Sequence, residues 1–387
     1  MELILKQYDI PLLRFSATND SSTPEIEVHW INEDQRHLLP LDMELSPEGI
    51  SRWMRRRTIP RNRAYANRLL AKCGLNANRP MGILALCKGL SVDDSYWVVE
   101  EGFEGTFEKY NLFENRFSEV LALIAFTGYG SSNRSSLASS PEFTTNGMLP
   151  KCWRRISGKV TLYKGGTDGG YNTGAEPYCE YYAAQVAAAM GIPYGLSQWK
   201  ERLCSTCELF TDIDHAYMPI GNLVQKGGFD AVAAYYENLG EPFQKAFRDM
   251  LVFDAVICNT DRHYGNFGFM IDNKTNTIAA PAPLFDHGNS LFNQAGPEDY
   301  ESPEAFQQYI DTLVPCVYDD FFATAKRFMT DENREQLRKL LGFRFKRHVR
   351  YNLPPKRLKL MEEQVRKRAM RLLGRPPPRG SPSVRMS

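Results

Sequence analysis

Three polar side chains in two short segments have the spacing that phosphoryl transfer requires. Asp261 and Asn266 form an Asp-x-x-x-x-Asn pattern within residues 259–266, Asn-Thr-Asp-Arg-His-Tyr-Gly-Asn. Asp286 lies in a Phe-Asp-x-Gly turn within residues 284–288. Phosphoryl transfer uses one carboxylate to orient and deprotonate the acceptor hydroxyl, and an amide with a second carboxylate to hold Mg²⁺ against the phosphates of ATP. We therefore assign Asp261 as the candidate base, and Asn266 and Asp286 as candidate Mg²⁺ ligands, because both offer hard oxygen donors.

His263 lies two residues after Asp261 and is a second candidate catalytic residue. It could brace the loop or, alternatively, transfer a proton itself. A competing interpretation is a metal-dependent hydrolase in which both histidines, His263 and His287, join Asp261 and Asp286 around a transition metal. Each short motif alone is commonly only a turn. Their combination in this order favours the phosphoryl-transfer interpretation.

A lysine and a glutamate upstream are candidate nucleotide-binding residues. Lys164 ends an alternating apolar segment, residues 160–164, and Glu176 and Glu180 begin an alanine-rich segment with helical character. Two glutamates four residues apart lie on one face of a helix. Either glutamate could reach Lys164 and fix the lysine on the phosphates of ATP, and Glu180 is the preferred partner. The plain alternatives are a solvated strand end and glutamates that offset the helix dipole.

Residues 128–147 are rich in Gly, Ser, Thr and Asn, which favours a loop. Such a loop could lie over phosphates and donate N–H groups and hydroxyls, with Ser140, Thr144 and Thr145 as the candidate contacts. The segment has no Gly-Lys-Ser/Thr, so it is not a Walker A loop. A plain surface loop is the alternative.

The apolar patterns around these residues predict a consistent set of elements. A hairpin carries Lys164, a helix carries Glu180, a long helix delivers Asp261, and a second hairpin returns the chain to Asp286. The expected ranges are hairpins 152–156/160–164 and 267–271/277–281, helices 64–73, 116–126, 177–190, 242–258 and several within 305–341, and strands 3–5, 26–31, 209–211 and 216–220. Met218-Pro219 is a plausible connector between lobes.

Charge is unevenly distributed along the chain. The 387 residues carry a formal net charge of +1, but residues 326–387 contain 19 Lys and Arg against 5 Asp and Glu. This basic segment is a candidate nucleic-acid contact. Residues 52–63 hold six arginines, which could bind a polyanion or, alternatively, pair with acidic groups elsewhere in the chain.

The remaining composition suits a cytoplasmic protein with no membrane segment. No apolar run approaches a membrane span, and the first residues do not resemble a secretory signal. Eight cysteines are scattered, and Cys204 and Cys207 form the one Cys-x-x-Cys pair. We expect reduced structural thiols, with a redox or metal role for this pair as the alternative.

The two catalytic segments resemble the catalytic and metal-binding loops of HipA-like protein kinases. Tyr163-Lys164 resembles the nucleotide lysine of that family, and the sequence from Glu180 onward resembles its small-lobe helix. The resemblance covers residues 135–345. It implies an α+β, two-lobed, atypical Ser/Thr kinase fold, distantly like phosphoinositide kinases, that uses ATP and Mg²⁺ on a protein substrate. It also implies a possible small DNA-binding antitoxin partner and autophosphorylation of a loop serine.

The loop departs from the family at the position of that serine. The family's commoner glycine-rich sequence ends in Gln-Pro-Lys, whereas this chain has Ser-Pro-Glu-Phe-Thr-Thr-Asn-Gly at residues 140–147. Regulation through one given serine is therefore open, and the available hydroxyls are Ser135, Ser136, Ser139, Ser140, Thr144 and Thr145.

We expect four regions along the chain. These are an N-terminal α/β domain (1–110), an ATP-binding small lobe (111–225), a mainly helical large lobe (226–345) and a basic, partly disordered tail (346–387). The alternative function is a nucleotide-sensing or nucleic-acid-binding regulator that uses the basic C-terminal segment.

Overall fold

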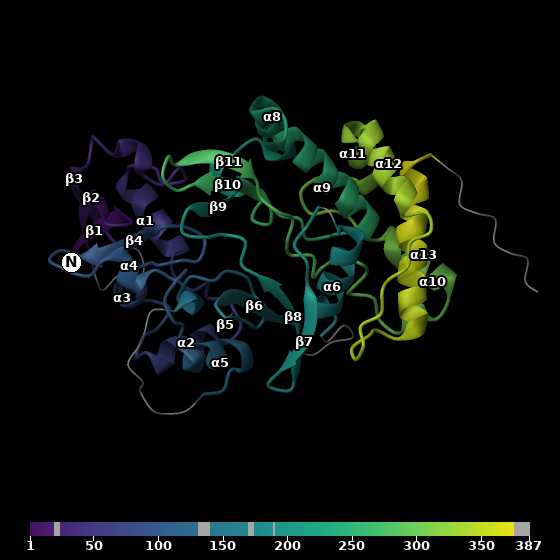
Figure 1. Ribbon diagram of the computed structural model, residues 1–387, viewed down its shortest axis with the longest axis horizontal. Helices are drawn as coiled ribbons and strands as arrows, with labels where there is room; N and C mark the ends of the chain where they lie inside the picture. The colour runs from purple at the N-terminus through teal and green to yellow at the C-terminus, as the bar shows by residue number, and fades with distance from the viewer. Residues whose placement is uncertain (19–23, 131–139, 169–173, 189, 375–387) are drawn as a thin grey trace, which may run out of the picture. The chain divides into compact units, whose positions relative to one another are not determined.

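The computed structural model describes residues 1–18, 24–130, 140–168, 174–188 and 190–374 (Figure 1). The chain divides into two compact units. Unit 1 contains Met1–Asp168, Tyr194–Lys226 and Tyr264–Pro283; unit 2 contains Gly169–Pro193, Gly227–His263 and Leu284–Ser387. The expectations for Ser135, Ser136, Ser139 and a disordered end at 375–387 lie outside the described residues.

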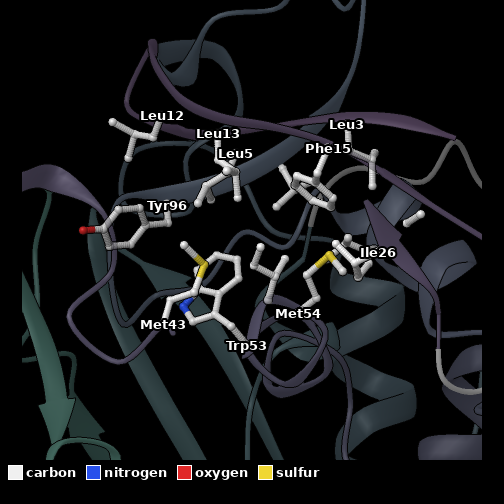
Figure 2. Close-up of a cluster of buried hydrophobic side chains, with 14 of the residues drawn as sticks. Leu3, Leu5, Leu12, Leu13, Phe15, Ile26, Met43, Trp53, Met54 and Tyr96 are labelled. Atoms are coloured by element: carbon white, nitrogen blue, oxygen red, sulfur yellow. The ribbon is translucent and has the colours of Figure 1, made fainter. Parts of the chain in front are cut away.

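Unit 1 begins with an antiparallel sheet in the order β3-β2-β1-β4. The strands are β1 (Glu2–Gln7), β2 (Ile10–Ala17), β3 (Ile26–Ile31) and β4 (Tyr96–Glu100). Alternate residues of β1 are buried, as the two-residue period of a strand requires. They pack with Trp53 and Met54 of helix α1 (Pro47–Arg56), as Figure 2 shows. The expected strands at 3–5 and 26–31 are confirmed.

A second core of unit 1 joins three helices to a second sheet. Helices α2 (Ala66–Lys72), α3 (Pro80–Cys87) and α5 (Glu119–Thr127) bury their apolar residues together with Cys152 and Cys204. Ser118 caps the start of α5 through the N–H of Leu121, and Gly128 ends it in the left-handed conformation, which glycine adopts without steric cost. The expected helices at 64–73 and 116–126 are confirmed, with shorter bounds.

Two further sheets complete unit 1. One has the order β5-β6-β8-β7, with β5 (Lys151–Ile156), β6 (Lys159–Gly165), β7 (Gly195–Trp199) and β8 (Arg202–Glu208). The other has the order β11-β10-β9, with β9 (His215–Pro219), β10 (Gly268–Asp272) and β11 (Thr277–Pro281). Both predicted hairpins are confirmed. A strand at 209–211 is wrong, because β8 ends at Glu208 and the Thr211 hydroxyl donates to the Val92 carbonyl instead of continuing a ladder.

Short helical turns link these elements of unit 1. They are η1 (Arg36–Leu38), α4 (Phe107–Tyr110), η2 (Pro141–Phe143) and α7 (Ile220–Leu223).

Buried polar side chains join the N-terminal sheet and the chain around η1 to the β10–β11 turn. Gln7 donates to the Asn273 carbonyl at 2.7 Å, and Asn276 donates to the His37 and Leu39 carbonyls at 2.9 and 2.7 Å. The first 110 residues are thus part of unit 1.

Unit 2 is built from helices. They are α6 (Glu176–Val186), α8 (Gly228–Leu239), α9 (Phe243–Ile257), α10 (Pro303–Asp311), α11 (Phe321–Phe328), α12 (Asp331–Lys339) and α13 (Pro355–Leu372), with the turn η3 (Glu298–Tyr300). Helix α9 is buried along most of its second half and contacts α8, α11 and α13. The expected helix at 242–258 is confirmed. The expected helix at 177–190 is shorter, because α6 ends at Val186.

The basic C-terminal segment contains helix α13, which Figure 1 shows beside the other helices of unit 2. Arg368 donates to the Ala255 carbonyl of α9 at 2.6 Å, and Arg357 donates to the Phe292 and Asn293 carbonyls at 3.2 Å. Arg366 donates to the Phe343 carbonyl at 2.8 Å. These arginines stabilise unit 2 internally.

The N-terminal arginines also pair within the protein. Arg57 makes two bonds to Asp94, at 2.7 and 2.8 Å, and Arg56 lies 3.2 Å from Asp42. The pairing alternative therefore accounts for both residues.

Cys204 and Cys207 lie on β8 three residues apart, so they point to opposite faces of the sheet and cannot share a metal ion. None of the eight cysteines, all of them described, forms a disulfide bond. Within the described residues, none of the helices has the length and apolar character to cross a membrane.

Candidate active site

Helix α9 delivers the loop that carries Asp261. Cys258 caps its C-terminal end: the left-handed backbone of Cys258 turns the chain, and its N–H bonds the Asp254 carbonyl. The Asn259 side chain then donates to Asp254 Oδ1 at 3.0 Å and accepts the Asp261 N–H at 3.2 Å. Asn259 is fully buried, so this turn is fixed on the end of the helix.

A buried ion pair fixes the same loop from a second side. Arg262 Nε and Nη2 bond the two carboxylate oxygens of Asp254 at 2.9 and 3.0 Å, with side-chain exposures of 1% and 0%. Arg262 Nη1 donates to the Phe285 carbonyl at 2.8 Å, next to Asp286. Burial alone would lower the pKa of Arg262, but Asp254 and Asp286 raise it, so the guanidinium stays charged. Arg262 thereby joins the Asp261 segment to the Asp286 segment.

Asn289 orients the carboxylate of Asp261. Its side-chain amide donates to Asp261 Oδ2 at 2.9 Å. Its carbonyl accepts both the N–H and the hydroxyl of Thr260, at 3.2 and 3.1 Å. The sequence interpretation missed Asn289, although it directly follows the Phe-Asp-x-Gly turn at Gly288.

Glu180 positions the Asp286 segment from helix α6. Its carboxylate accepts the His287 N–H at 2.8 Å, and Glu180 is fully buried. Gly288 packs so tightly on α6 that an added Cβ would lie 3.3 Å from Glu176 Cβ. Asp286 itself has a left-handed backbone, with φ of 58°. Unit 2 therefore brings Asp261, Glu180 and Asp286 into one connected network.

The two histidines have different environments. His263 is exposed, and its N–H bonds the Asp261 carbonyl at 2.9 Å within the turn. His287 is fully buried, with its ring edge-on to Phe253 at 5.2 Å. Across the described ranges, no group of three or more His, Cys, Asp or Glu side chains is placed to hold a metal ion.

Lys164 lies on β6 in unit 1 and is buried. Its direct register partner on β5 is a second buried lysine, Lys151. Directly opposed residues share one face of an antiparallel sheet, and two like charges in that position repel each other. Two cationic side chains on one face of the sheet suit an anion such as a phosphate group. The Lys151 ammonium also donates to the Asn146 carbonyl at 2.9 Å and lies near the Glu142 carboxylate. Lys151 is a further candidate that the sequence interpretation missed.

The three predicted loop hydroxyls bond within the loop and its surroundings. Ser140 is 1% exposed and accepts the Glu142 N–H at 3.4 Å. Thr144 is 4% exposed and donates to the Leu90 carbonyl at 2.9 Å. Thr145 donates to the Pro141 carbonyl at 2.7 Å. All three lie in unit 1 around η2, where they shape the loop backbone.

Asn266 lies in unit 1, because the chain passes from unit 2 to unit 1 between His263 and Tyr264. It is buried. The α7 turn anchors its flanks: the Gly221 N–H bonds the Tyr264 carbonyl and the Ile220 N–H bonds the Phe267 carbonyl, both at 3.0 Å. Asp286 belongs to unit 2, so the expected joint role of Asn266 and Asp286 as Mg²⁺ ligands stays a prediction.

No protein-family model matches the chain. It is 27% identical over 135 residues to the serine/threonine-protein kinase CtkA of Helicobacter pylori strain J99. The match covers 30% of this chain and 41% of that protein, so the chain spans less than half the length of this curated relative. A crystal structure of the H. pylori proinflammatory kinase CtkA covers 58% of this chain and 94% of its own, at 15% identity and a TM-score of 0.45.

A second solved structure matches over nearly the whole of both chains. It belongs to the HipA toxin–antitoxin system of Shewanella oneidensis MR-1, solved as a complex of HipA, HipB and operator DNA. It covers 96% of this chain and 98% of its own, with a TM-score of 0.51 and 13% identity. The expected α+β class is confirmed. This protein therefore has the fold of that HipA over nearly its whole length.

Proposed function

We propose that this protein is an ATP- and Mg²⁺-dependent kinase that transfers the γ-phosphoryl group to a serine or threonine hydroxyl of a protein. The observation that carries the proposal is the fixed orientation of Asp261. Its carboxylate accepts a bond from Asn289, on a loop held by the buried Asp254–Arg262 pair. A carboxylate held in this way can align an acceptor hydroxyl and take up its proton.

The other residues have supporting roles in this proposal. Lys164 and Lys151 would bind nucleotide phosphates, and Asn266 and Asp286 would hold Mg²⁺, which neutralises phosphate charge when bound. Glu180 holds the backbone after Asp286. His263 would brace the Asp261 turn.

The test is incubation with γ-labelled ATP, Mg²⁺ and a generic protein acceptor. Wild type is expected to label itself or the acceptor, and Asp261→Asn and Asp286→Asn are expected to lose the label. Asp311→Asn, an exposed carboxylate of unit 2, is the matched control and should label like wild type. A wild-type protein that binds ATP but neither labels a protein nor hydrolyses ATP would refute the kinase and favour a nucleotide sensor.

Autophosphorylation is the second part of the proposal, supported by the resemblance to kinases that modify a loop serine. Ser140 and Thr144 are buried, so we expect labelling elsewhere in the loop, at Ser135, Ser136, Ser139 or Thr145. Mass spectrometry of the labelled protein tests this. Label on none of these residues would refute it.

A toxin role with a small DNA-binding antitoxin is the third part. Its support is the fold shared with a HipA solved beside HipB and operator DNA. The expected location is the cytoplasm. Expression of the wild-type protein is expected to arrest growth, and a co-expressed antitoxin partner should relieve the arrest. Expression of Asp261→Asn should not arrest growth. Arrest that persists in Asp261→Asn would contradict a kinase-dependent toxin.

A further inference from the structure

Arg63 and Glu142 form a deeply buried ion pair at the base of the 140–151 loop. Both side chains are 1% exposed. Arg63 ends the arginine-rich N-terminal stretch, and Glu142 lies in the η2 turn, 79 residues further along. Both belong to unit 1. Neither residue has a role in the phosphoryl-transfer site as described so far.

The Arg63 guanidinium bonds the loop at its start, middle and end. Nη1 donates to the Glu142 carbonyl and, at 3.4 Å, to the Thr145 carbonyl. Nη2 donates to the Glu142 carboxylate and, at 2.9 Å, to the Lys151 carbonyl. The second carboxylate oxygen of Glu142 accepts the Trp153 N–H at 2.8 Å. One ion pair thus joins the loop to the first residues of β5.

Neighbouring bonds extend this connection. The N–H of Ala64, next to Arg63, bonds the Met148 carbonyl at 2.8 Å. The Trp153 indole donates to the Thr145 hydroxyl at 3.0 Å, and the Lys151 ammonium donates to the Asn146 carbonyl at 2.9 Å. The N-terminal segment therefore fixes the path of the loop and the backbone of Lys151.

The chemistry of the pair suits a positioning role. A guanidinium is a rigid, planar fork of donors, so it fixes several acceptors at once where a lysine would not. Burial raises the pKa of Glu142, and Arg63 beside it acts in the opposite direction. Binding groups that are held in place before the ligand arrives lose less entropy on binding, which increases affinity.

We propose that Arg63 and Glu142 are positioning residues that hold the 140–151 loop and Lys151 in the shape that binds nucleotide phosphates. This inference rests on the proposed kinase function and adds the N-terminal segment to its nucleotide site. The pair shapes the loop and does not itself contact ATP.

The test compares three variants by direct binding of a fluorescent ATP analogue and by kinetics. Arg63→Lys and Glu142→Gln should raise Kd and the KM for ATP by about tenfold, the effect of losing one bond to a charged group. The kcat at saturating ATP should change much less. Arg63→Met combined with Glu142→Leu removes both charges and keeps the packing, so it should fold with a Tm near that of wild type. It should still bind the analogue weakly.

Hydrogen exchange supplies a readout that needs no nucleotide. Amides of residues 142–153, including Trp153, should exchange faster in the double variant than in wild type. Arg57→Lys is the matched control, because Arg57 is also buried and bonds a carboxylate and two carbonyls, none of them in the loop. It should leave Kd and loop exchange unchanged.

The outcomes are distinguishable. A double variant with wild-type Kd and wild-type exchange in the loop overturns the positioning role. A wild-type protein that binds no nucleotide refutes the proposed function. In that case, the hydrogen-exchange rates of the 142–153 amides still decide whether the Arg63–Glu142 pair holds the 140–151 loop in place.

Discussion

At the scale of single residues, the site depends on side chains that orient the candidate base. Asp261 carries the proposed chemistry, but its direction is set by the amide of Asn289. A proton acceptor is effective only within hydrogen-bond reach of the group that it deprotonates. The contribution of Asn289 should therefore appear in turnover, while substrate binding depends on other groups.

Asn289→Ala is expected to lower kcat by about ten- to a hundredfold with little change in the KM for ATP, because a misaligned base loses part of the usual 10²–10⁴-fold contribution. Steady-state kinetics with γ-labelled ATP measures this. Gln294→Ala is the control, since this exposed side chain only reaches Asn289 at 3.5 Å. Equal kcat values for wild type and Asn289→Ala would show that Asp261 needs no such support.

Cys316 reports the charge of Asp261 within unit 2. It is the one exposed residue among the eight cysteines, and partial burial of its thiol together with the Asp261 carboxylate raises its pKa to about 11. The thiolate is the reactive form, so alkylation should be slow at pH 8 and still increase above pH 10. Asp261→Asn should speed alkylation at pH 8 by roughly twofold, because one nearby negative charge is removed. Peptide mass spectrometry follows the rate, and an unchanged rate would contradict this proximity.

At the scale of elements, the end of α9 and the turn before Asp286 depend on one buried ion pair. Asp254 lies on the helix, Arg262 lies on the loop, and Arg262 also reaches the Phe285 carbonyl. Breaking a buried pair from one side leaves an uncompensated charge inside the protein. Stability and loop geometry are therefore coupled at this point.

Asp254→Asn is expected to lower the free energy of unfolding by about 3–5 kcal/mol, since Arg262 would remain buried without its carboxylate. Chemical denaturation monitored by circular dichroism measures the loss. The control is Glu332→Gln. Glu332 is the exposed partner of Lys245, which lies on α9 like Asp254, and its loss should lower the free energy of unfolding by at most about 1 kcal/mol. Similar losses in the two variants would exclude a special role for the Asp254–Arg262 pair.

Sequence patterns predicted the elements with strong local periodicity. The α9 helix and the two hairpins have apolar repeats and short turns that need no distant partner. Strand β4 of the N-terminal sheet was missed, since it pairs with β1 from far along the chain. Strand β2 was also missed, although it forms a local hairpin with β1 in which Gln7 lies opposite Ile10. The strand expected at 209–211 failed because local composition cannot show that Thr211 bonds Val92.

The residues of the candidate active site were, like the secondary-structure elements, predictable in part. Asp261, Asn266 and Asp286 follow from residue type and spacing, and their roles remain predictions. Asn289 and the Arg63–Glu142 pair could not be predicted, because each depends on a contact between segments whose proximity only the fold creates. Lys151 lies opposite Lys164 in the predicted hairpin and was missed because the expected first strand began at residue 152. Glu180 was expected to pair with Lys164, and the structure adds its bond to the His287 N–H.

At the scale of the whole molecule, the terminal regions are built into the two units. Gln7 of the N-terminal sheet and the chain around η1 are bonded to the β10–β11 turn through Asn273 and Asn276, and α13 is bonded to α9 through Arg368. A ligand that binds only the folded protein stabilises it in proportion to the logarithm of its concentration over Kd. Thermal unfolding of the intact chain therefore measures nucleotide binding without requiring turnover.

MgATP at a hundred times its Kd is expected to stabilise the wild-type protein by about 2.7 kcal/mol and to raise its Tm accordingly. Asp261→Asn should keep this shift, because the proposed base acts on the acceptor hydroxyl and does not bind nucleotide. Lys164→Met should lose most of it, because the buried ammonium is removed from the phosphate site. Lys159→Met is the control, since Lys159 lies on the same strand but pairs with Glu208 in solvent. Retention of the full shift in Lys164→Met would place the phosphates away from β6, and loss of the shift in Asp261→Asn would assign Asp261 to nucleotide binding.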